Sequence, residues 1–431
     1  MITADLLFPI AVHHSFKYAW HEDKEPVIGS MVRAKLLNRT LVGVVWSGRA
    51  VQPFDQKGFL HLKPVLGTID LPPLSLKHIQ FIEWLASYYL VSYGQALKLT
   101  LNIKRAFEPR FQKIICLDHK GLGQLHKQQT KPLTKRQMQV VDWLKEHLSA
   151  EPTTLMREAS VSRDILTRLQ KKGLLKVIHQ IKPDEDIEAP NPDYGIIKFY
   201  EEQKQAFNTI EQWFDHHSAQ RKPLVVEGVT GSGKTELYFE LIAKALKDKE
   251  GQILVMLPEI ALTLQWVKRF KKRFGSMPDI WHSDLSEHQR AKIWRRVIQS
   301  KTRLVIGVRS SLFLPFNNLS LIIIDEEHDG AYKQDDGTIY HARDMAVICA
   351  KLHHAALMLV SATPSFETKA NILKNRYQHV VLKTRALQAS PVKIELINMR
   401  LQNLPRGVLI SEPLKEGVNQ ALSSQLQSLL F

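Results

Sequence analysis

The feature that most constrains the fold is a glycine-rich segment, GVTGSGKT at 228–235, which fits the pattern G-x-x-x-x-G-K-[ST]. It follows an apolar run at 224–226 and precedes a helical pattern that begins near Glu236. A strand, a glycine-rich turn and a helix in this order form a phosphate-binding loop, because backbone N–H groups then face phosphate oxygens at a helix N-terminus. The flanking elements disfavour a chance glycine-rich turn, so the segment predicts a nucleotide-binding α/β lobe.

Each part of this loop has an expected role. Lys234 would reach the β- and γ-phosphates of ATP, and the Thr235 hydroxyl would ligate Mg²⁺. The predicted ATP-binding residues of the loop are Gly228, Val229, Thr230, Gly231, Ser232, Gly233, Lys234, Thr235 and Glu236.

A second signal lies about 90 residues further on, where the apolar run 321–324 ends in Asp325, Glu326, Glu327 and His328. Asp325 would hold Mg²⁺, and Glu326 lies where a general base would polarise the attacking water. His328 is placed to sense the γ-phosphate. An acidic cluster after a strand is usually a solvated loop. Here the cluster follows a phosphate-binding loop at about 90 residues, and this spacing favours an ATPase site. Lys234, Asp325 and Glu326 are therefore the predicted catalytic residues.

The chain divides into regions whose sequence patterns predict different secondary structure. Short β-like runs at 6–12, 31–35 and 41–46 precede a helical pattern at 75–90, so residues 1–105 predict a small α+β domain. Residues 106–180 carry three helical patterns and a strand, which indicates a winged helix; a plain three-helix spacer is the alternative. A proline-rich acidic linker covers 181–198. Alternating apolar runs and helical patterns over 199–405 predict a RecA-like parallel sheet.

Charge and composition narrow the partners. Lys and Arg number 59 against 43 Asp and Glu, a net charge of +16, so a polyanion is the first partner to consider. Two cysteines exclude a disulfide framework and a four-cysteine zinc site. Because no apolar run approaches the roughly 18 residues of a membrane span and the N-terminus lacks a signal-peptide pattern, we expect a cytoplasmic protein without membrane contact.

The motifs together resemble those of the PriA family of replication-restart helicases in superfamily 2. The matching strings are GVTGSGKTE at 228–236, LPEIALT at 257–263, GVRSSLFLP at 307–315, DEEHDGAYKQ at 325–334, YHARD at 340–344 and SATPS at 361–365. The resemblance implies a multidomain protein in which a 3′-end DNA-binding domain, a winged helix and a P-loop motor lobe follow one another. It implies an ATP-dependent 3′-to-5′ DNA helicase that binds stalled forks and single strands. Primosome proteins and single-strand-binding protein are the implied protein partners.

The resemblance also assigns roles to residues outside the phosphate-binding loop. Gln203 matches a glutamine that reads adenine. Motifs that line single-stranded DNA contain Pro258, Glu259, Thr263, Arg309 and Ser310. The loop 332–340 couples DNA contact to hydrolysis, and Tyr332 and Lys333 in this loop are predicted DNA-binding residues. The implied 3′-end pocket contains Phe16, Lys17 and Tyr18, and Lys17 stands where the family usually has aspartate.

The last residues, 406–431, resemble the start of a second motor lobe. Zinc is expected in the complete family protein, but this chain has no ligands for it. Two alternatives stay open: a passive module that binds forked DNA without catalysis, and another DNA translocase of superfamily 2.

Overall fold

The computed structural model describes residues 2–21, 25–46, 62–108, 111–118, 132–181, 188–216, 221–258, 264–385, 397–398 and 410–423. The chain forms two compact units, Met1–Thr384 and Arg385–Phe431. In the second unit one helix, α14 (Glu412–Ser423), is described. Residues 406–409 and 424–431 of the segment expected to begin a second motor lobe lie outside the described residues. No helix in the described ranges is long and apolar enough to cross a membrane.

The N-terminal region contains a five-stranded antiparallel sheet in the order β2-β1-β4-β3-β5. Its strands are β1 (Ile2–Leu7), β2 (Phe16–Trp20), β3 (Met31–Leu36), β4 (Arg39–Val45) and β5 (Val65–Thr68). The strand expected at 6–12 ends early: β1 stops at Leu7, and bends follow from Pro9. Proline has no N–H for the ladder and fixes φ, which accounts for the early end.

Three helical elements follow this sheet: α2 (Leu76–Tyr88), α3 (Tyr93–Leu101) and the 3₁₀ turn η1 (Lys104–Phe107). Ser75 begins α2 by accepting the backbone N–H of His78 at 3.2 Å, as an N-cap does. The expected helix at 75–90 is thus present, and a second helix follows it.

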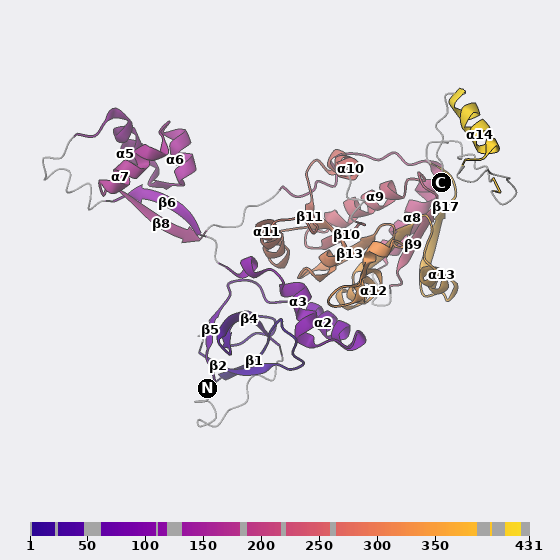
Figure 1. Ribbon diagram of the computed structural model, residues 1–431, viewed down its shortest axis with the longest axis horizontal. Helices are drawn as coiled ribbons and strands as arrows, with labels where there is room; N and C mark the ends of the chain where they lie inside the picture. Colours follow the sequence, from indigo (N-terminus) through magenta and orange to yellow (C-terminus); the bar gives the residue numbers. More distant parts are fainter. Residues whose placement is uncertain are drawn as a thin grey trace. The chain divides into compact units, whose positions relative to one another are not determined.

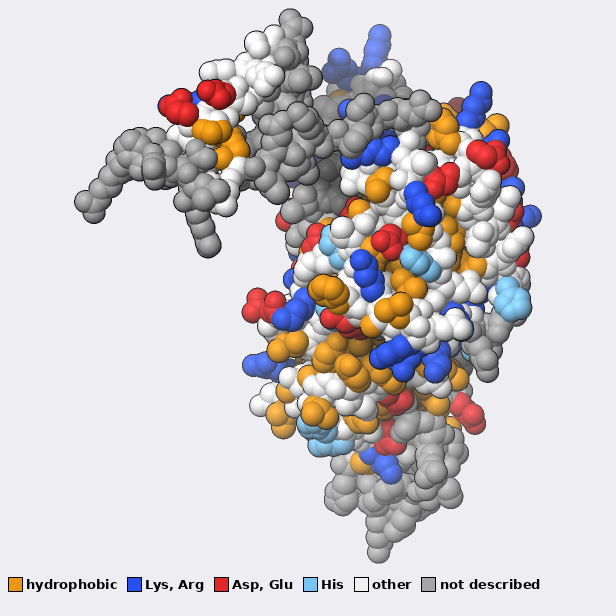
Figure 2. Space-filling model, turned by 90° about the vertical axis from the view of Figure 1, so that its right-hand side faces the viewer, with side chains coloured by type: hydrophobic (Ala, Val, Ile, Leu, Met, Phe, Trp, Pro, Cys, Tyr) orange, Lys and Arg blue, Asp and Glu red, His pale blue; other side chains and the backbone are white. Residues whose placement is uncertain are grey.

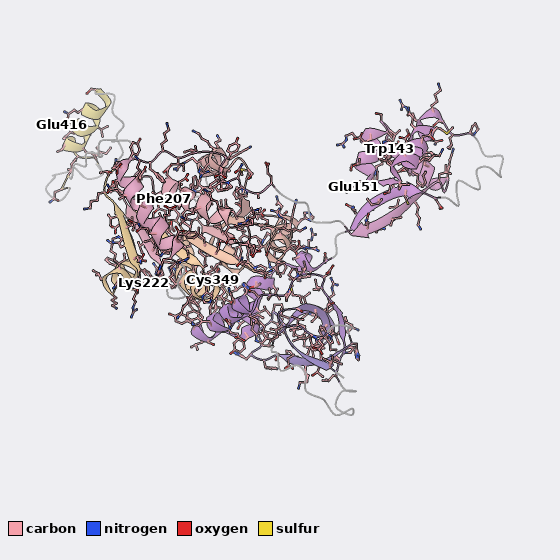
Figure 3. All side chains as sticks on the ribbon, turned by 180° about the vertical axis from the view of Figure 1, so that it is seen from behind. Trp143, Glu151, Phe207, Lys222, Cys349 and Glu416 are labelled. Carbon is pink, nitrogen blue, oxygen red and sulfur yellow. The ribbon has the colours of Figure 1, made fainter. Side chains whose placement is uncertain are left out.

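Residues 111–181 contain the three helices and the strand expected there, together with two further strands that the sequence pattern did not predict. The elements are β6 (Phe111–Leu117), α5 (Lys135–His147), β7 (Ser149–Ala150), α6 (Pro152–Glu158), α7 (Arg163–Lys171) and β8 (Leu175–Ile181). The strands pair in the order β7-β6-β8. Thr134 caps α5, and Gly173, at φ +71°, follows the end of α7. On α5, Trp143 stacks on His147 with ring centroids 4.0 Å apart (Figure 3).

The predicted motor lobe is built on a seven-stranded parallel sheet in the order β11-β12-β10-β13-β16-β9-β17 (Figure 1). The strands are β9 (Leu224–Gly228), β10 (Gln252–Met256), β11 (Asp279–Trp281), β12 (Leu304–Gly307), β13 (Leu319–Ile324), β16 (Ala356–Ser361) and β17 (Gln378–Leu382). Because all pairs are parallel, every strand ends at the same edge of the sheet.

Helices cover both faces of this sheet. α8 (Glu201–Asp215), α9 (Lys234–Lys247) and α10 (Leu264–Phe274) share a core with Leu224 and Val226 of β9. The intervening Val225 belongs to the core of the opposite face, together with α11 (Glu287–Ile298) and α12 (Ala342–His353). Successive side chains of a strand point to opposite faces, so continuous apolar strands can be buried on both.

The N-terminal helices and the motor lobe share one hydrophobic core. Phe81 of α2 stacks on Phe313 of the lobe with ring centroids 5.7 Å apart. The Trp294 indole of α11 donates to the carbonyl of Thr100 at 2.9 Å. Cys349 is buried on α12 within the same core (Figure 3). The N-terminal helices are therefore fixed to the lobe by buried apolar contact and by a buried hydrogen bond.

Candidate nucleotide and DNA sites

The predicted nucleotide motifs meet at the carboxyl edge of the parallel sheet. The phosphate-binding loop follows β9, the acidic motif follows β13, and SATP begins at the end of β16, which pairs with both. Ligands of open α/β sheets bind at this edge. Residues from 228 to 361 thus come together because their strands are neighbours.

Two glycines give the phosphate-binding loop its path. Gly231 and Gly233 have φ of +82° and +86°, in the left-handed region that favours glycine. At Gly233 a Cβ would collide with the Gln203 side chain. The loop then enters α9 directly at Lys234.

Two side chains of the loop fit a bound polyphosphate. The Lys234 ammonium donates to the carbonyls of Gly228 at 2.6 Å and Val229 at 3.3 Å, and burial lowers its pKa. The Ser232 hydroxyl is buried without a hydrogen-bond partner in the described part of the chain. Buried polar groups are normally partnered. The oxygens of a bound phosphate would pair with the Lys234 ammonium and would accept a hydrogen bond from the Ser232 hydroxyl.

Gln203 lies against this loop. Its side-chain Nε2 donates to the carbonyl of Ser232 at 3.0 Å, and its Oε1 accepts the backbone N–H of Tyr200 at 3.0 Å. The side chain is 4% exposed. Its amide thus bridges the start of α8 and the loop, while adenine reading remains a prediction.

Asp325, a predicted magnesium ligand, is held by hydrogen bonds on both carboxylate oxygens. Tyr238 donates to Oδ2 at 3.0 Å and the Glu326 N–H donates to Oδ1 at 3.0 Å. Burial and the neighbouring charge of Glu326 raise the pKa of Asp325 to about 6. Tyr238 also lies within hydrogen-bonding reach of the Thr235 hydroxyl, so the two predicted magnesium ligands share one neighbour.

The residues fit Mg²⁺ bound together with a nucleotide. Mg²⁺ commonly takes one or two protein oxygens and completes its shell with phosphates and water. Asp325 and Thr235 supply such oxygens. No group of three or more His, Cys, Asp or Glu that could hold a metal ion occurs among the residues with described positions.

Glu326 and His328 connect the acidic motif to β16. Glu326 has a φ of +46°, which is unusual for a residue with a side chain. His328 Nδ1 lies 3.7 Å from the Glu326 carboxylate and 2.8 Å from the Ser361 hydroxyl of SATP. His328, the predicted sensor, therefore lies between Glu326, the predicted base, and Ser361 of SATP.

Glu327, the third carboxylate of the motif, has a role that sequence reasoning missed. It is fully buried and accepts hydrogen bonds from the Ser365 N–H at 2.7 Å, from Thr368 at 3.0 Å and from Arg343 at 3.2 Å. Arg343 belongs to YHARD and Ser365 to SATPS. The side chain therefore joins three motifs instead of facing nucleotide. In the sequence, the signal for this role of Glu327 is that all three motifs occur in the same chain.

The predicted DNA-lining and coupling residues gather beside the nucleotide edge. Arg309 donates to the carbonyls of Ala331 and Lys333, both at 3.0 Å, and Ser310 accepts the Trp281 indole N–H at 3.0 Å. Arg309, Ser310, Pro258, Ser283 and Gln334 contribute to a pocket of about 180 Å³. Glu259 and Thr263 lie outside the described residues.

Tyr332 of the coupling loop is buried, with 1% of its surface exposed. Its hydroxyl oxygen lies 2.6 Å from the carbonyl oxygen of Asp325 and 3.0 Å from that of Met256, and its one proton is shared between these two acceptors. The exposed Lys333 pairs with Asp335 at 3.0 Å. Tyr332 thus ties the loop to the end of β13, and DNA binding by Tyr332 and Lys333 stays a prediction.

The predicted 3′-end residues lie on β2. Phe16 and Tyr18 pack around Phe8, with ring centroids 6.1 and 5.8 Å away, and Tyr18 donates to the Lys35 carbonyl at 3.0 Å. Lys17 is exposed and lies opposite Asp5 of β1 in the strand register. Two of the three side chains therefore build the small domain, and Lys17 lies at its surface.

Basic side chains do not form one continuous patch on the face shown in Figure 2, where they are interspersed with apolar and acidic ones. On α10, Arg269 and Arg273 pair with Glu236 and Glu240 of α9. Lys268, Lys271 and Lys272 of that helix are exposed, so its basic face is partly neutralised and partly solvated.

Family models match two parts of the chain. Residues 200–372 match the DEAD/DEAH box helicase family, and residues 5–102 match the 3′ DNA-binding domain of PriA. The parallel sheet and its phosphate-binding loop thus belong to a helicase motor domain, preceded by a domain of the 3′ DNA-binding class.

Curated relatives identify the family. "Replication restart protein PriA" of Rickettsia prowazekii (strain Madrid E) is 33% identical over 437 residues, covering 100% of this chain and 53% of that protein. The protein of the same name from Chlamydia pneumoniae is 33% identical, covering 99% and 57%. That of Haemophilus influenzae is 34% identical, covering 86% and 50%. The chain belongs to the PriA family of replication restart proteins, and it spans about half the length of the curated relatives it matches.

Proposed function

We propose that the chain is the DNA-binding and first motor part of a replication-restart helicase. In this proposal the complete machine binds stalled forks, moves 3′-to-5′ along DNA with ATP and promotes primosome assembly. The observation that carries it is the convergence of Lys234, Asp325 and Glu326 at one sheet edge, in a lobe fixed to the 3′ DNA-binding domain.

The proposed hydrolysis uses this chain's residues in stated roles. Lys234 neutralises phosphate charge, and Glu326 accepts a proton from the attacking water. Thr235 and Asp325 would hold Mg²⁺, which neutralises charge on the β- and γ-phosphate oxygens when bound. The contact of His328 with Glu326 and Ser361 offers a path by which the nucleotide state reaches SATP.

Fork recognition requires shape and strand ends instead of base sequence. Phosphate contacts supply most of the affinity of such proteins and make it depend on salt. The net charge of +16 supports this assignment. We propose that residues 106–180 form a winged helix, which the helices and the three-stranded sheet of this region support. We propose primosome proteins and single-strand-binding protein as partners by family membership.

Binding of matched DNA substrates tests the proposal. Fluorescence anisotropy should show tighter binding of a labelled fork than of a duplex with equal length, at several salt concentrations. The logarithm of the binding constant should fall linearly with the logarithm of the salt concentration. Equal affinity for fork and duplex at every salt concentration would contradict fork recognition.

A second candidate is a passive fork-binding module without catalysis. The contacts of Arg309 and Arg343 favour this candidate, because both guanidinium groups are engaged within the lobe. Arg309 donates to the carbonyls of Ala331 and Lys333, and Arg343 donates to Glu327. An ATPase assay with and without forked DNA separates the two candidates.

A further inference from the structure

Tyr238 occupies a central position behind the predicted magnesium site. It lies on α9, one turn after Thr235, and is fully buried. Its hydroxyl lies 3.0 Å from Asp325 Oδ2 and 2.7 Å from the indole nitrogen of Trp266 on α10, and the Thr235 hydroxyl is also within hydrogen-bonding reach. One phenol therefore hydrogen-bonds to Asp325 and to Trp266 of a neighbouring helix, and it lies close to Thr235, the second predicted magnesium ligand.

The direction of these hydrogen bonds follows from the chemistry of the groups. An indole N–H can only donate, and an ionised carboxylate can only accept. Because Trp266 donates to the Tyr238 oxygen, the single phenol proton is directed to Asp325. The pair thus orients one carboxylate oxygen and leaves the remaining lone pairs of Asp325 for other ligands.

Packing fixes the indole in place. Trp266 stacks on Phe270 with ring planes 12° apart and centroids 5.5 Å apart, and it meets Phe239 edge to face with centroids 5.3 Å apart. Trp266 is 6% exposed. Side chains that are held in place by packing keep a metal ligand in one geometry.

We propose that Tyr238 is a positioning residue that presets Asp325 and Thr235 for Mg²⁺, with Trp266 fixing the direction of its hydroxyl. The inference rests on the proposed ATPase function and deepens it. Tyr238 touches neither nucleotide nor metal in this proposal. It acts by holding the two ligands at the separation and orientation that the metal requires.

The competing explanation is that the hydroxyl only stabilises the core. The two explanations differ in what they predict for nucleotide binding. A purely structural role would change binding of ADP equally with and without Mg²⁺. A positioning role changes only the part of the affinity that depends on the metal, because Lys234 and the loop backbone still bind the phosphates.

The experiment is a Mg²⁺ titration of fluorescent ADP binding to the full chain and to Tyr238→Phe. We expect the half-saturating Mg²⁺ concentration to rise about tenfold or more in the variant, while ADP affinity in EDTA stays within about twofold, as for loss of an outer-shell partner. Trp266→Phe keeps an aromatic ring but removes the donor, and should shift the titration in the same direction by less. If Tyr238→Phe does not fold, Trp266→Phe decides the question.

Trp213→Phe is the matched control. Trp213 belongs to the same core as Tyr238 and Trp266, and its indole donates to the Lys222 carbonyl at 2.9 Å, away from the site. This variant should leave the Mg²⁺ titration unchanged. An unshifted titration in both site variants, with Mg²⁺-dependent binding intact in the parent chain, would overturn the positioning role alone. A parent chain that binds no ADP would overturn the proposed function as well.

Discussion

Arg343 donates to the buried carboxylate of Glu327 at 3.2 Å, and this pair joins the YHARD segment to the acidic motif. Arg343 also donates to Ser365 at 2.7 Å, so SATPS enters the same network. The three carboxylates of the acidic motif therefore have different roles. Asp325 and Glu326 face the predicted nucleotide site, whereas Glu327 stabilises the lobe.

Removing one partner of this pair should destabilise the lobe. Arg343→Met leaves an uncompensated buried carboxylate, and we expect a loss of about 3–5 kcal/mol in the free energy of unfolding. The double variant Arg343→Met with Glu327→Gln should recover part of that loss. Urea unfolding of the three proteins measures it. Glu326→Gln, at a half-exposed position, is the control and should unfold near the parent midpoint; equal losses in all variants would contradict the division of roles.

Lys234→Ala should abolish phosphate-dependent binding of ADP and ATP while leaving DNA binding intact. The ammonium is the cation inside the loop, within 2.6 Å of the Gly228 carbonyl, at the N-terminus of α9. Titration with fluorescent nucleotide, and with labelled forked DNA in parallel, checks both parts.

Lys244→Ala is the control for Lys234→Ala. Lys244 lies on the same helix but pairs with Glu211 at 2.7 Å and Asp215 at 2.8 Å. It should bind nucleotide as the parent does. Unchanged ATP affinity in Lys234→Ala would show that the phosphate-binding loop is wrongly assigned.

Local pattern was enough to predict the phosphate-binding loop, most strands of the parallel sheet and most helices, because each depends on a few consecutive residues. The GKT segment and the capped helix after Thr134 are examples. The roles of Glu327 and Tyr238 could not be predicted, since they depend on which strands and helices become neighbours. Tyr332 shows the same limit: its neighbours in sequence face the surface, but its hydroxyl reaches the carbonyl of Met256 on β10.

Acid should weaken the junction between α2 and α12. His78 and His353 are buried there, at 1% and 4% exposure, and His78 Nε2 lies 2.9 Å from the Thr100 hydroxyl. Burial lowers the pKa of His78 to about 3, with the charge of His353 a lesser cause. Burial, and then the charges of Lys77 and His354, lower the pKa of His353 to about 4.

The sign of the pH effect follows from linkage. The unfolded state binds a proton near pH 6.5 and the folded state only near 3–4, so stability is full above about 6.5 and falls as the pH drops toward 4. At pH 5 the loss is roughly 2 kcal/mol per histidine. His78→Gln should reduce the difference between urea midpoints at pH 7.5 and pH 5. The exposed His288→Gln should not, and an equal reduction in both variants would contradict the assignment.

Lys17 should weaken the preference for a free 3′-hydroxyl. A lysine cannot accept a hydrogen bond from a terminal nucleotide, whereas it can pair with a phosphate. Lys17 is exposed on β2, opposite Asp5 of β1 in the strand register. Forks ending in a 3′-hydroxyl and in a 3′-phosphate should bind with similar affinity, and Lys17→Asp should partly restore the preference for the hydroxyl.

Lys104→Asp controls for the change of charge alone, because Lys104 is exposed in the same region on η1. It should lower affinity for both forks without changing their ratio. A strong hydroxyl preference in the unmodified chain would refute the role given to Lys17.

The 431-residue polypeptide by itself should bind forked DNA and Mg²⁺-nucleotide but hydrolyse ATP slowly and unwind no duplex. Motors of this class close the site with arginines from a second lobe, which contribute on the order of 10³–10⁵ in rate. In this chain Arg343 is committed to Glu327, Asp344 and Ser365, and Arg309 to two carbonyls of the coupling loop. Neither guanidinium can close over the γ-phosphate without breaking these contacts.

Steady-state ATPase at saturating fork DNA is the direct measurement of this expectation, with Glu326→Gln as the background. The parent chain should exceed that background only slightly, because Lys234, Thr235, Asp325 and Glu326 supply one side of the site. Translocation also requires two lobes that move against each other on the strand, so a helicase assay on the same fork should show no displaced strand. A turnover of several per second that disappears in Glu326→Gln would show that this lobe completes its own site, and the arginine assignment would then have to move to residues within the chain.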